Sequence, residues 1–318
     1  MPTHRVSPAL NACAGVPHPP VDNYPRAREA YPPRHSEVLE SNWLQKDEMK
    51  YLNPWDMLCS LWGRRELIWQ LAKREIQGRY RATYLGLLWS ILTPLLLLVI
   101  YTFVFAVVFR ARWGDGPESR AEFALTMFCG MLLFTLFSDV VNRSPFMVVS
   151  NPNYVKKVVF PLEVFVVSGL IGALFNLLIG LGVWMVGMIL LMHAPPLTVL
   201  WLPVVLLPVC LTTAGVGWVL ASLGVFIRDI GQAVALVTQV LFFITPIFYS
   251  IERVPYPYRR LLELNPLTHA VEDARRVMMY GLPPNWGMWA ATLAGSAVVA
   301  LLGYAVFMKS KRAFADVV

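Results

Sequence analysis

Charged residues are scarce in this chain. Asp, Glu, Lys and Arg make up 15% of its 318 residues, whereas soluble domains carry about 25%. Hydrophobic residues make up 57%, and the mean hydropathy is +0.54. So few charged residues cannot cover the surface of a soluble protein. The composition therefore excludes an ordinary soluble domain and is typical of a membrane protein.

Cysteine and histidine are also sparse, and neither residue type forms a cluster. The cysteines are Cys13, Cys59, Cys129 and Cys210, with no Cys-x-x-Cys spacing. His269 has two acidic neighbours but no second histidine or thiol near it in the sequence. We therefore expect neither a disulfide framework nor a metal site.

Two further features are missing. The sequence has no Gly-Lys pair and so lacks the GxxxxGK[ST] motif that holds nucleotide phosphates. We therefore expect no ATP hydrolysis by that route. Residues 1–35 contain eight prolines and no apolar run, so we expect no cleaved signal peptide. This composition predicts that residues 1–50 form a disordered tail.

Six long apolar runs dominate the rest of the chain. A helix needs about 20 apolar residues to cross a bilayer. The runs lie at residues 86–109, 123–141, 162–192, 197–227, 230–250 and 286–308. They predict an all-α membrane domain over residues 82–318 with six transmembrane helices.

The lysines set the predicted orientation. With six spans, all seven fall on the side of the termini: Lys46, Lys50, Lys73, Lys156, Lys157, Lys309 and Lys311. Cationic residues are enriched in cytoplasmic loops, so we expect both termini in the cytoplasm. We attribute the net charge of +7 to this topology and to contact of the cytoplasmic face with anionic lipid. We therefore expect no nucleic-acid partner.

Residues 54–81 precede the first apolar run and alternate apolar with charged residues at helical spacing. This pattern predicts an amphipathic helix in the cytoplasmic interface, with tryptophans toward lipid and cations toward water. Gly78 is expected to let the chain turn into the membrane. A plain juxtamembrane linker is the alternative.

A short cytoplasmic element is predicted between the second and third runs. Asn151 is a good N-cap, Pro152 suits the first helical position, and Pro161 cannot continue a helix. We expect a rigid helix of about two turns over residues 152–160, on which a motor subunit could press. An ordinary amphipathic connector is the alternative.

The segment from 251 to 285 is too long for a simple link and too apolar to be fully solvated. Broken backbone at membrane depth is tolerated where protein buries it. We therefore predict a re-entrant periplasmic pair of short helices, joined near Asn265-Pro266, before the last span. Glu272 could pair with Arg275 or Arg276 three or four residues later and latch this pair as a gate. Asp139 and Arg143 have the same helical spacing and are expected to pair.

Several motifs occur in order between residues 66 and 318. They are Arg74-Glu75-Ile76, Leu85-Gly86-Leu87-Leu88-Trp89, residues 151–163, Phe226-Ile227-Arg228-Asp229-Ile230, Thr245-Pro246-Ile247-Phe248-Tyr249 and Leu264-Asn265-Pro266-Leu267-Thr268. Together they resemble the ABC-2-type polysaccharide export permeases, nearest to the O-antigen and teichoic-acid branch.

The resemblance implies a homodimer that pairs with two copies of a separate ATPase in the bacterial inner membrane. ATP and Mg would bind to that partner, so this chain would be a transport subunit without a cofactor or a catalytic site. The complex would move undecaprenyl-diphosphate-linked polysaccharide from the cytoplasm to the periplasm.

Candidate site residues follow from this expectation. Sugar rings pack on aromatic faces, and arginine forks suit a diphosphate. For coupling to the ATPase we expect Asn151, Tyr154, Lys156, Lys157 and Glu66; for the glycan pathway Trp89, Tyr101, Phe105, Phe134, Phe137 and Tyr249; for the lipid diphosphate Arg74, Arg79 and Arg81; and for the periplasmic gate Glu272, Arg275 and Arg276.

Two other functions fit part of the sequence. An ABC-2 exporter of drugs or lipids would share the architecture, and the aromatic content argues against it only weakly. A membrane-embedded acyl- or glycosyltransferase would need clustered acids, bases or metal ligands at the interface. The sequence offers no such cluster.

Overall fold

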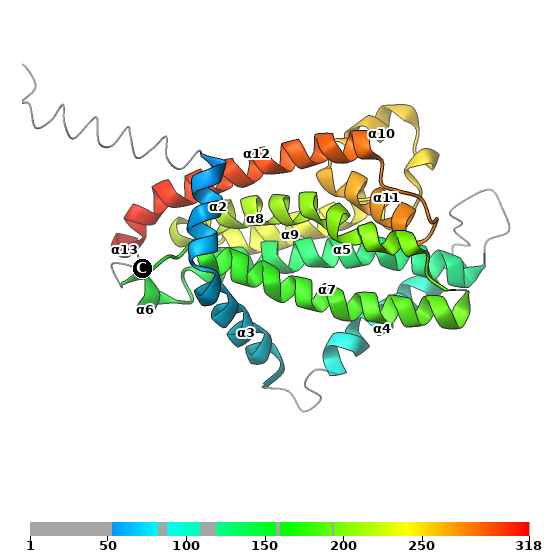
Figure 1. Cartoon of the computed structure of the whole chain (residues 1–318), viewed down its shortest axis with the longest axis horizontal. Helices are drawn as coiled ribbons and strands as arrows, with labels where there is room; N and C mark the ends of the chain where they lie inside the picture. The colour runs from blue at the N-terminus through cyan, green and yellow to red at the C-terminus, as the bar shows by residue number, and fades with distance from the viewer. Residues whose placement is uncertain (1–52, 82–87, 109–118, 157–159, 193, 318) are drawn as a thin grey trace, which may run out of the picture. The chain divides into compact units, whose positions relative to one another are not determined.

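The computed structural model describes residues 53–81, 88–108, 119–156, 160–192 and 194–317 (Figure 1). These residues form helices and connecting turns, and no β-strand occurs among them. The prediction of an all-α protein is therefore confirmed.

Four helices are long and apolar enough to cross a membrane. They are α5 (Arg120–Met147), α7 (Val164–Leu191), α8 (Leu202–Phe226, preceded by the 3-10 turn η3, Leu197–Trp201) and α12 (Trp286–Ser310). They run along one common direction in Figure 1. The helix α5 contacts α7 and α8, and α8 also packs on α12. These helices match the predicted second, third, fourth and sixth runs to within a few residues.

The first and fifth runs form shorter helices. The helix α4 (Trp89–Thr102) continues directly as a π-helix, η2 (Phe103–Val108), and α9 spans Ile230–Ile244. The predicted helical run to residue 250 is wrong after Ile244. Pro246 disfavours helical backbone at the residue before it, and Thr245 is accordingly extended. Residues 86, 87 and 109 of the first run lie outside the described residues.

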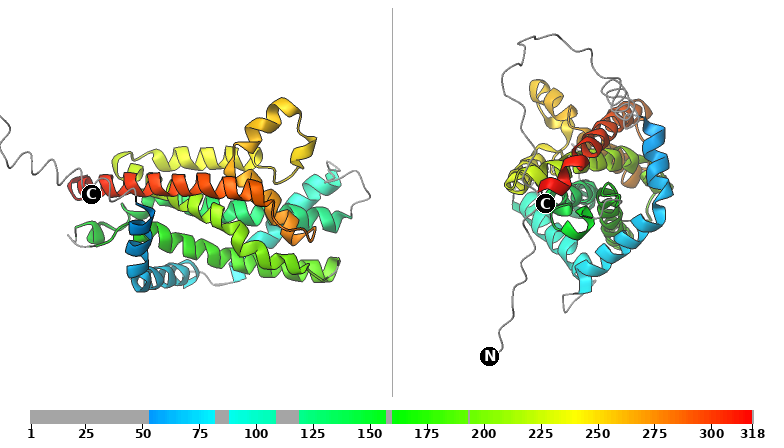
Figure 2. Two further views of the ribbon diagram at one scale, coloured as in Figure 1. Left: turned by 45° about the horizontal axis from the view of Figure 1, so that its top comes forward. Right: turned by 90° about the vertical axis from the view of Figure 1, so that its left-hand side faces the viewer.

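Two helices replace the single one predicted over residues 54–81. They are α2 (Pro54–Gly63) and α3 (Arg65–Arg81), separated at Arg64. Because α3 continues through Gly78, the turn predicted there is wrong. Figure 2 shows α2 and α3 passing along one side of the bundle, and α3 packs on α7. Trp62 and Trp69 are 73% and 63% exposed, as a helix facing a membrane interface requires.

The element after α5 is shorter than predicted. The helix α6 covers only Pro152–Val155, and Lys156 forms a turn. Residues 157–159 lie outside the described residues, and Phe160 is not helical. Pro152 occupies the first helical position as predicted, but Asn151 does not cap α6 with its side chain. Its Nδ2 instead donates to the carbonyl of Met147 at 3.0 Å, at the end of α5, so the first turn of α6 lacks a side-chain cap.

Two short helices lie in the segment for which a re-entrant pair was predicted. The helices α10 (Tyr256–Glu263) and α11 (Pro266–Met278) follow a short 3-10 turn, η4 (Ile251–Arg253). Asn265 caps α11 by accepting a hydrogen bond from the Leu267 N–H at 3.1 Å. The pair lies at the opposite end of the bundle from α6 and the C-terminal helix α13 (Phe314–Val317) (Figure 1).

The backbones of α8 and α12 approach each other closely at two glycines. A Cβ atom on Gly303 would lie 2.7 Å from the carbonyl carbon of Gly215, closer than real Cβ atoms come. A hydrogen bond of 2.8 Å from Thr212 to Ser296 joins the same two helices. Such small residues allow helices to pack at short range in a membrane.

We expect Gly303→Ala to lower the thermal unfolding midpoint of the purified protein. The new methyl group would collide with the α8 backbone, and overpacking of this kind costs about 1–3 kcal/mol. Gly295→Ala in the same helix meets open space and should leave the midpoint unchanged or raise it, because alanine favours helix. Equal midpoints for the two variants would contradict the close approach.

Candidate functional site

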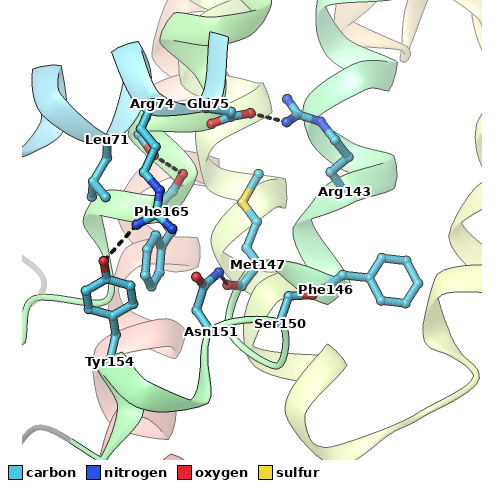
Figure 3. A pocket seen from close by; sticks show the side chains of 11 residues that line it. Leu71, Arg74, Glu75, Arg143, Phe146, Met147, Ser150, Asn151, Tyr154 and Phe165 are labelled. Atoms are coloured by element: carbon cyan, nitrogen blue, oxygen red, sulfur yellow. Dashed lines mark hydrogen bonds and ion pairs between the residues drawn. The ribbon is translucent and has the colours of Figure 1, made fainter. Parts of the chain in front are cut away.

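A pocket of about 370 Å³ lies between α3, the end of α5, α6 and the start of α7; we call it the α3–α6 pocket (Figure 3). The helix α3 supplies residues three and four apart, which share one face of a helix, and α5 does the same. The lining residues are Leu71, Arg74, Glu75, Arg143, Phe146, Met147, Ser150, Asn151, Tyr154, Phe165 and Ser168.

Arg74 and Tyr154 connect α3 to α6 across this pocket. The Arg74 guanidinium donates a hydrogen bond of 3.0 Å to the Tyr154 hydroxyl oxygen (Figure 3). The Tyr154 ring also packs on Phe160 and Phe165, with centroid distances of 4.5 and 5.8 Å. Tyr154, predicted as a contact with the ATPase, is therefore engaged within its own subunit.

The other residues predicted for coupling are dispersed. Lys156 is exposed after α6, and Glu66 is exposed in the first turn of α3. Asn151 binds the end of α5, as described above. Lys157 lies outside the described residues.

Four charged side chains form a closed set of ion pairs, which we call the four-charge ring. Arg79 contacts Glu75 at 3.2 Å and Asp139 at 2.9 Å. Arg143 pairs with Asp139 at 3.1 Å and with Glu75. The predicted Asp139–Arg143 pair is thus confirmed, while the contribution of Glu75 was missed. The ring carries no net charge, as partly buried charges require.

A second cavity lies on the other side of the ring, between α4, α5 and α7. Its volume is about 320 Å³. Arg79 and Asp139 line this cavity, whereas Glu75 and Arg143 line the α3–α6 pocket. Most other lining residues are apolar, among them Trp89, which was predicted for the glycan pathway. The ring therefore separates a polar pocket from a largely apolar cavity.

The arginines predicted for a lipid diphosphate fall in different places. Arg74 lines the α3–α6 pocket, and Arg79 belongs to the four-charge ring. The side chain of Arg81 lies outside the described residues. No group of three or more metal-ligating side chains occurs in the part of the chain that the structure describes.

A fully buried carboxylate, Glu163, holds together several elements near α6. Its side chain accepts from Arg64, at the break between α2 and α3, and from Lys311 at 2.8 Å in the 3-10 turn η5 (Lys311–Ala313). Trp218 of α8 donates to the main-chain oxygen of Glu163 at 3.0 Å. An acid two residues after Pro161, at the start of an apolar run, was the sequence signal available for this site.

Three of the aromatic residues predicted for the glycan pathway meet in one packed cluster. Tyr101 and Phe105 contact Phe248 at centroid distances of 5.3 and 4.5 Å, and Phe134 contacts Phe242 at 5.0 Å. Phe137 joins the edge of this cluster through Phe134, at 6.3 Å. These rings pack against each other inside the subunit.

Tyr249 has a different role. Its hydroxyl donates to the carbonyl of Ile244 at 2.8 Å. That carbonyl belongs to the last turn of α9, where helix carbonyls have no partner within the helix. Tyr249 therefore provides a hydrogen-bond donor for the last carbonyl of α9.

The residues predicted for the gate lie on α11. Arg275 is fully buried and pairs with Glu272 at 2.8 Å, three residues away as predicted. It also donates to the carbonyls of Pro246 and Ile247, at 2.6 and 3.0 Å, in the irregular segment after α9. Arg276 instead donates to the carbonyl of Pro283 at 3.0 Å. Burial raises the pKa of Glu272, and the Arg275 guanidinium opposes that shift.

Comparisons with known proteins give consistent matches. The family described as ABC-2 type transporter matches residues 66–280. Two proteins of Klebsiella pneumoniae named O-antigen export system permease protein RfbA are 26% and 25% identical over 253 residues, covering 79% of this chain and 95% of each relative. A Myxococcus xanthus protein of the same name is 27% identical over 262 residues, covering 82% of this chain and 98% of the relative.

We expect Glu163→Gln to destabilise the protein by roughly 3 kcal/mol, because it leaves two cations without their buried carboxylate. The measurement is the thermal unfolding midpoint of the purified protein. Asp229→Asn removes an exposed carboxylate from the start of α9 and should change the midpoint little. A midpoint for Glu163→Gln that matches the Asp229→Asn control would contradict the bridging role of Glu163.

Proposed function

Since the chain belongs to the ABC-2 type transporter family, we propose that its complex exports a polysaccharide carried on undecaprenyl diphosphate, from the cytoplasm to the periplasm. This chain is the membrane subunit, and ATP is hydrolysed by a separate subunit. The observation that carries the proposal is the match to O-antigen export permeases over 95–98% of their length. A match over nearly the whole length of each relative supports a shared substrate class in addition to a shared fold.

The complex contains two copies of this chain and two ATPase subunits, with both termini in the cytoplasm. Exposed apolar faces on α4 with its continuation η2, and on α9, support pairing of two copies. Ile100 and Phe103 are 52% and 59% exposed, and Leu236 and Val240 are 65% and 51% exposed. Such faces meet either lipid or another helix in a membrane.

The ATPase acts on the α6 end of the bundle. Four hydrogen bonds of three residues support transmission of force from this end: Tyr154 binds α3, Asn151 binds α5, and Glu163 binds the α2–α3 break and the C-terminal η5 turn. A displacement of α6 would therefore move several elements together. Lys156, Lys157 and Glu66 are the proposed contacts with the ATPase.

The periplasmic gate moves at α10. Arg275 fixes α11 to the segment after α9 through buried hydrogen bonds, and removing such a partner is costly. In contrast, Tyr258 and Leu261 of α10 are 66% and 65% exposed. Glu272 and Arg276 support α11 from the same helix, so the more exposed α10 is the proposed moving part of the pair.

Deletion of the gene tests this function. We expect loss of long-chain surface polysaccharide on gels and accumulation of undecaprenyl-linked polymer by mass spectrometry, both restored by the intact gene. Unchanged surface polysaccharide without a trapped intermediate, in a strain with no second exporter, would favour an ABC-2 exporter of drugs or lipids.

We also expect Lys156→Glu combined with Lys157→Glu to impair assembly with the ATPase or ATP-dependent export, because the change reverses two charges at the proposed contact. Copurification of the ATPase and an export assay measure the effect. The control reverses Lys46 and Lys50 in the same way, outside the family match. Normal assembly and export in the first variant would show that the two lysines are not contacts.

A further inference from the structure

We propose that the α3–α6 pocket binds the diphosphate headgroup of a polyprenyl lipid, and that the bond between Arg74 and Tyr154 reports this binding to α6. The inference rests on the proposed function, because the lipid is the carrier of the exported glycan. It adds a means by which a loaded substrate regulates the ATPase.

The charges that line the pocket leave one cation available. Arg143 and Glu75 are paired within the four-charge ring, which has no net charge. Arg74 has a neutral partner, the Tyr154 hydroxyl, and no carboxylate of the described residues lies within ion-pair distance of it. The pocket lining therefore carries a net positive charge that comes from Arg74.

The Arg74 side chain can accept a second ligand. A guanidinium has five N–H donors in a planar fork that matches phosphate oxygens. Arg74 is exposed on α3 and borders a pocket of about 370 Å³. Ser150 and Asn151 add polar atoms to the same wall. A phosphate group can thus reach the guanidinium without moving a helix.

The pocket lies at a suitable depth for a lipid headgroup. Arg74 shares α3 with Trp69, which is 63% exposed. Tryptophan is enriched where hydrocarbon meets the headgroup region. The α3 helix therefore carries both an interfacial anchor and a phosphate ligand.

Binding at Arg74 changes what α6 contacts. Hydrogen bonds to a charged acceptor are roughly twice as strong as those to a neutral one. A diphosphate therefore competes with Tyr154 for the guanidinium and weakens the link from α3 to α6. The Tyr154 ring keeps its contacts with Phe160 and Phe165, so only the α3 side of α6 is released. Because α6 is the proposed site of action of the ATPase, its release changes the rate of ATP hydrolysis.

The binding test uses the complete complex with its ATPase in nanodiscs of zwitterionic lipid, titrated with undecaprenyl diphosphate. We expect Arg74→Gln to weaken the apparent Kd about tenfold, since it removes a charge-assisted bond. Lys73→Gln removes the same charge from a neighbouring exposed position of α3 that does not line the pocket, and should leave the Kd near that of wild type. If Arg74→Gln fails to assemble with the ATPase, Arg74→Lys, which keeps the charge, is tested in its place.

The second test separates signalling from binding. Tyr154→Phe removes only the competing hydroxyl, so binding should be as tight as in wild type or tighter. The ATPase rate should become the same with and without undecaprenyl diphosphate, whereas the control Tyr280→Phe, at an exposed tyrosine outside α6 and α10, should respond like wild type. Loss of binding in Tyr154→Phe, or wild-type binding in Arg74→Gln, overturns the inference.

Two further probes identify the source of the phosphate. Responses to undecaprenyl diphosphate, but not to phosphatidylglycerol or inorganic diphosphate, support the inference. An equal response to phosphatidylglycerol assigns the pocket to bilayer phospholipid. An equal response to inorganic diphosphate assigns the pocket to a free anion. Either result overturns the proposal that the polyprenyl carrier lipid occupies the pocket. If wild type exports no polysaccharide, the proposed function fails. If export is normal but Arg74→Gln binds like wild type, only this inference fails.

Discussion

The pairing of two arginines with two carboxylates determines how the N-terminal helices meet the bundle. Arg79 and Glu75 come from α3, and Asp139 and Arg143 come from α5. Each charge alone would be costly near a membrane, but the closed set neutralises all four. The ring therefore links α3 to α5 through side chains, while α3 itself packs on α7, and it forms the wall between the two cavities. The Arg74–Tyr154 bond is positioned by this arrangement, because Arg74 directly precedes Glu75 on α3.

Buried polar groups serve a related purpose at both ends of the bundle. Near α6, Glu163 binds Arg64 and Lys311. Near α10, Arg275 donates to carbonyls that no helix satisfies. Arg275 replaces the backbone partners that regular secondary structure would have provided, whereas Glu163 neutralises two cationic side chains. The apolar helices between these ends need no such bonds, since their backbone groups are paired internally.

Apolar length and proline position were sufficient to predict most of the fold. They located α5, α7, α8 and α12, and the Asn265-Pro266 motif located the start of α11. The failures have local causes: Pro246 ends α9 early, and the Asn151 side chain binds α5 instead of capping α6. The two-turn coupling helix was wrong even though its first residue was right, because α6 ends at Val155.

The candidate site was less predictable. The Asp139–Arg143 and Glu272–Arg275 pairs follow from helical spacing, so both could be foreseen. The Glu75–Arg79 pair of the ring has the same helical spacing. The other two ring contacts join residues 60 and 68 positions apart, and only tertiary packing brings them together. For the same reason, the aromatic residues chosen for the glycan pathway could not be divided in advance into those that pack together and those that border a cavity.

The close approach of α8 and α12 has a consequence for how the subunit changes shape. Backbone contact at Gly215 and Gly303 leaves no space in which these helices can slide past each other. We therefore expect α8 and α12 to move together as one frame. The chain leaves this frame for α9 through the three residues after Phe226. We expect a change in the angle between α8 and α9 to take place in that connection.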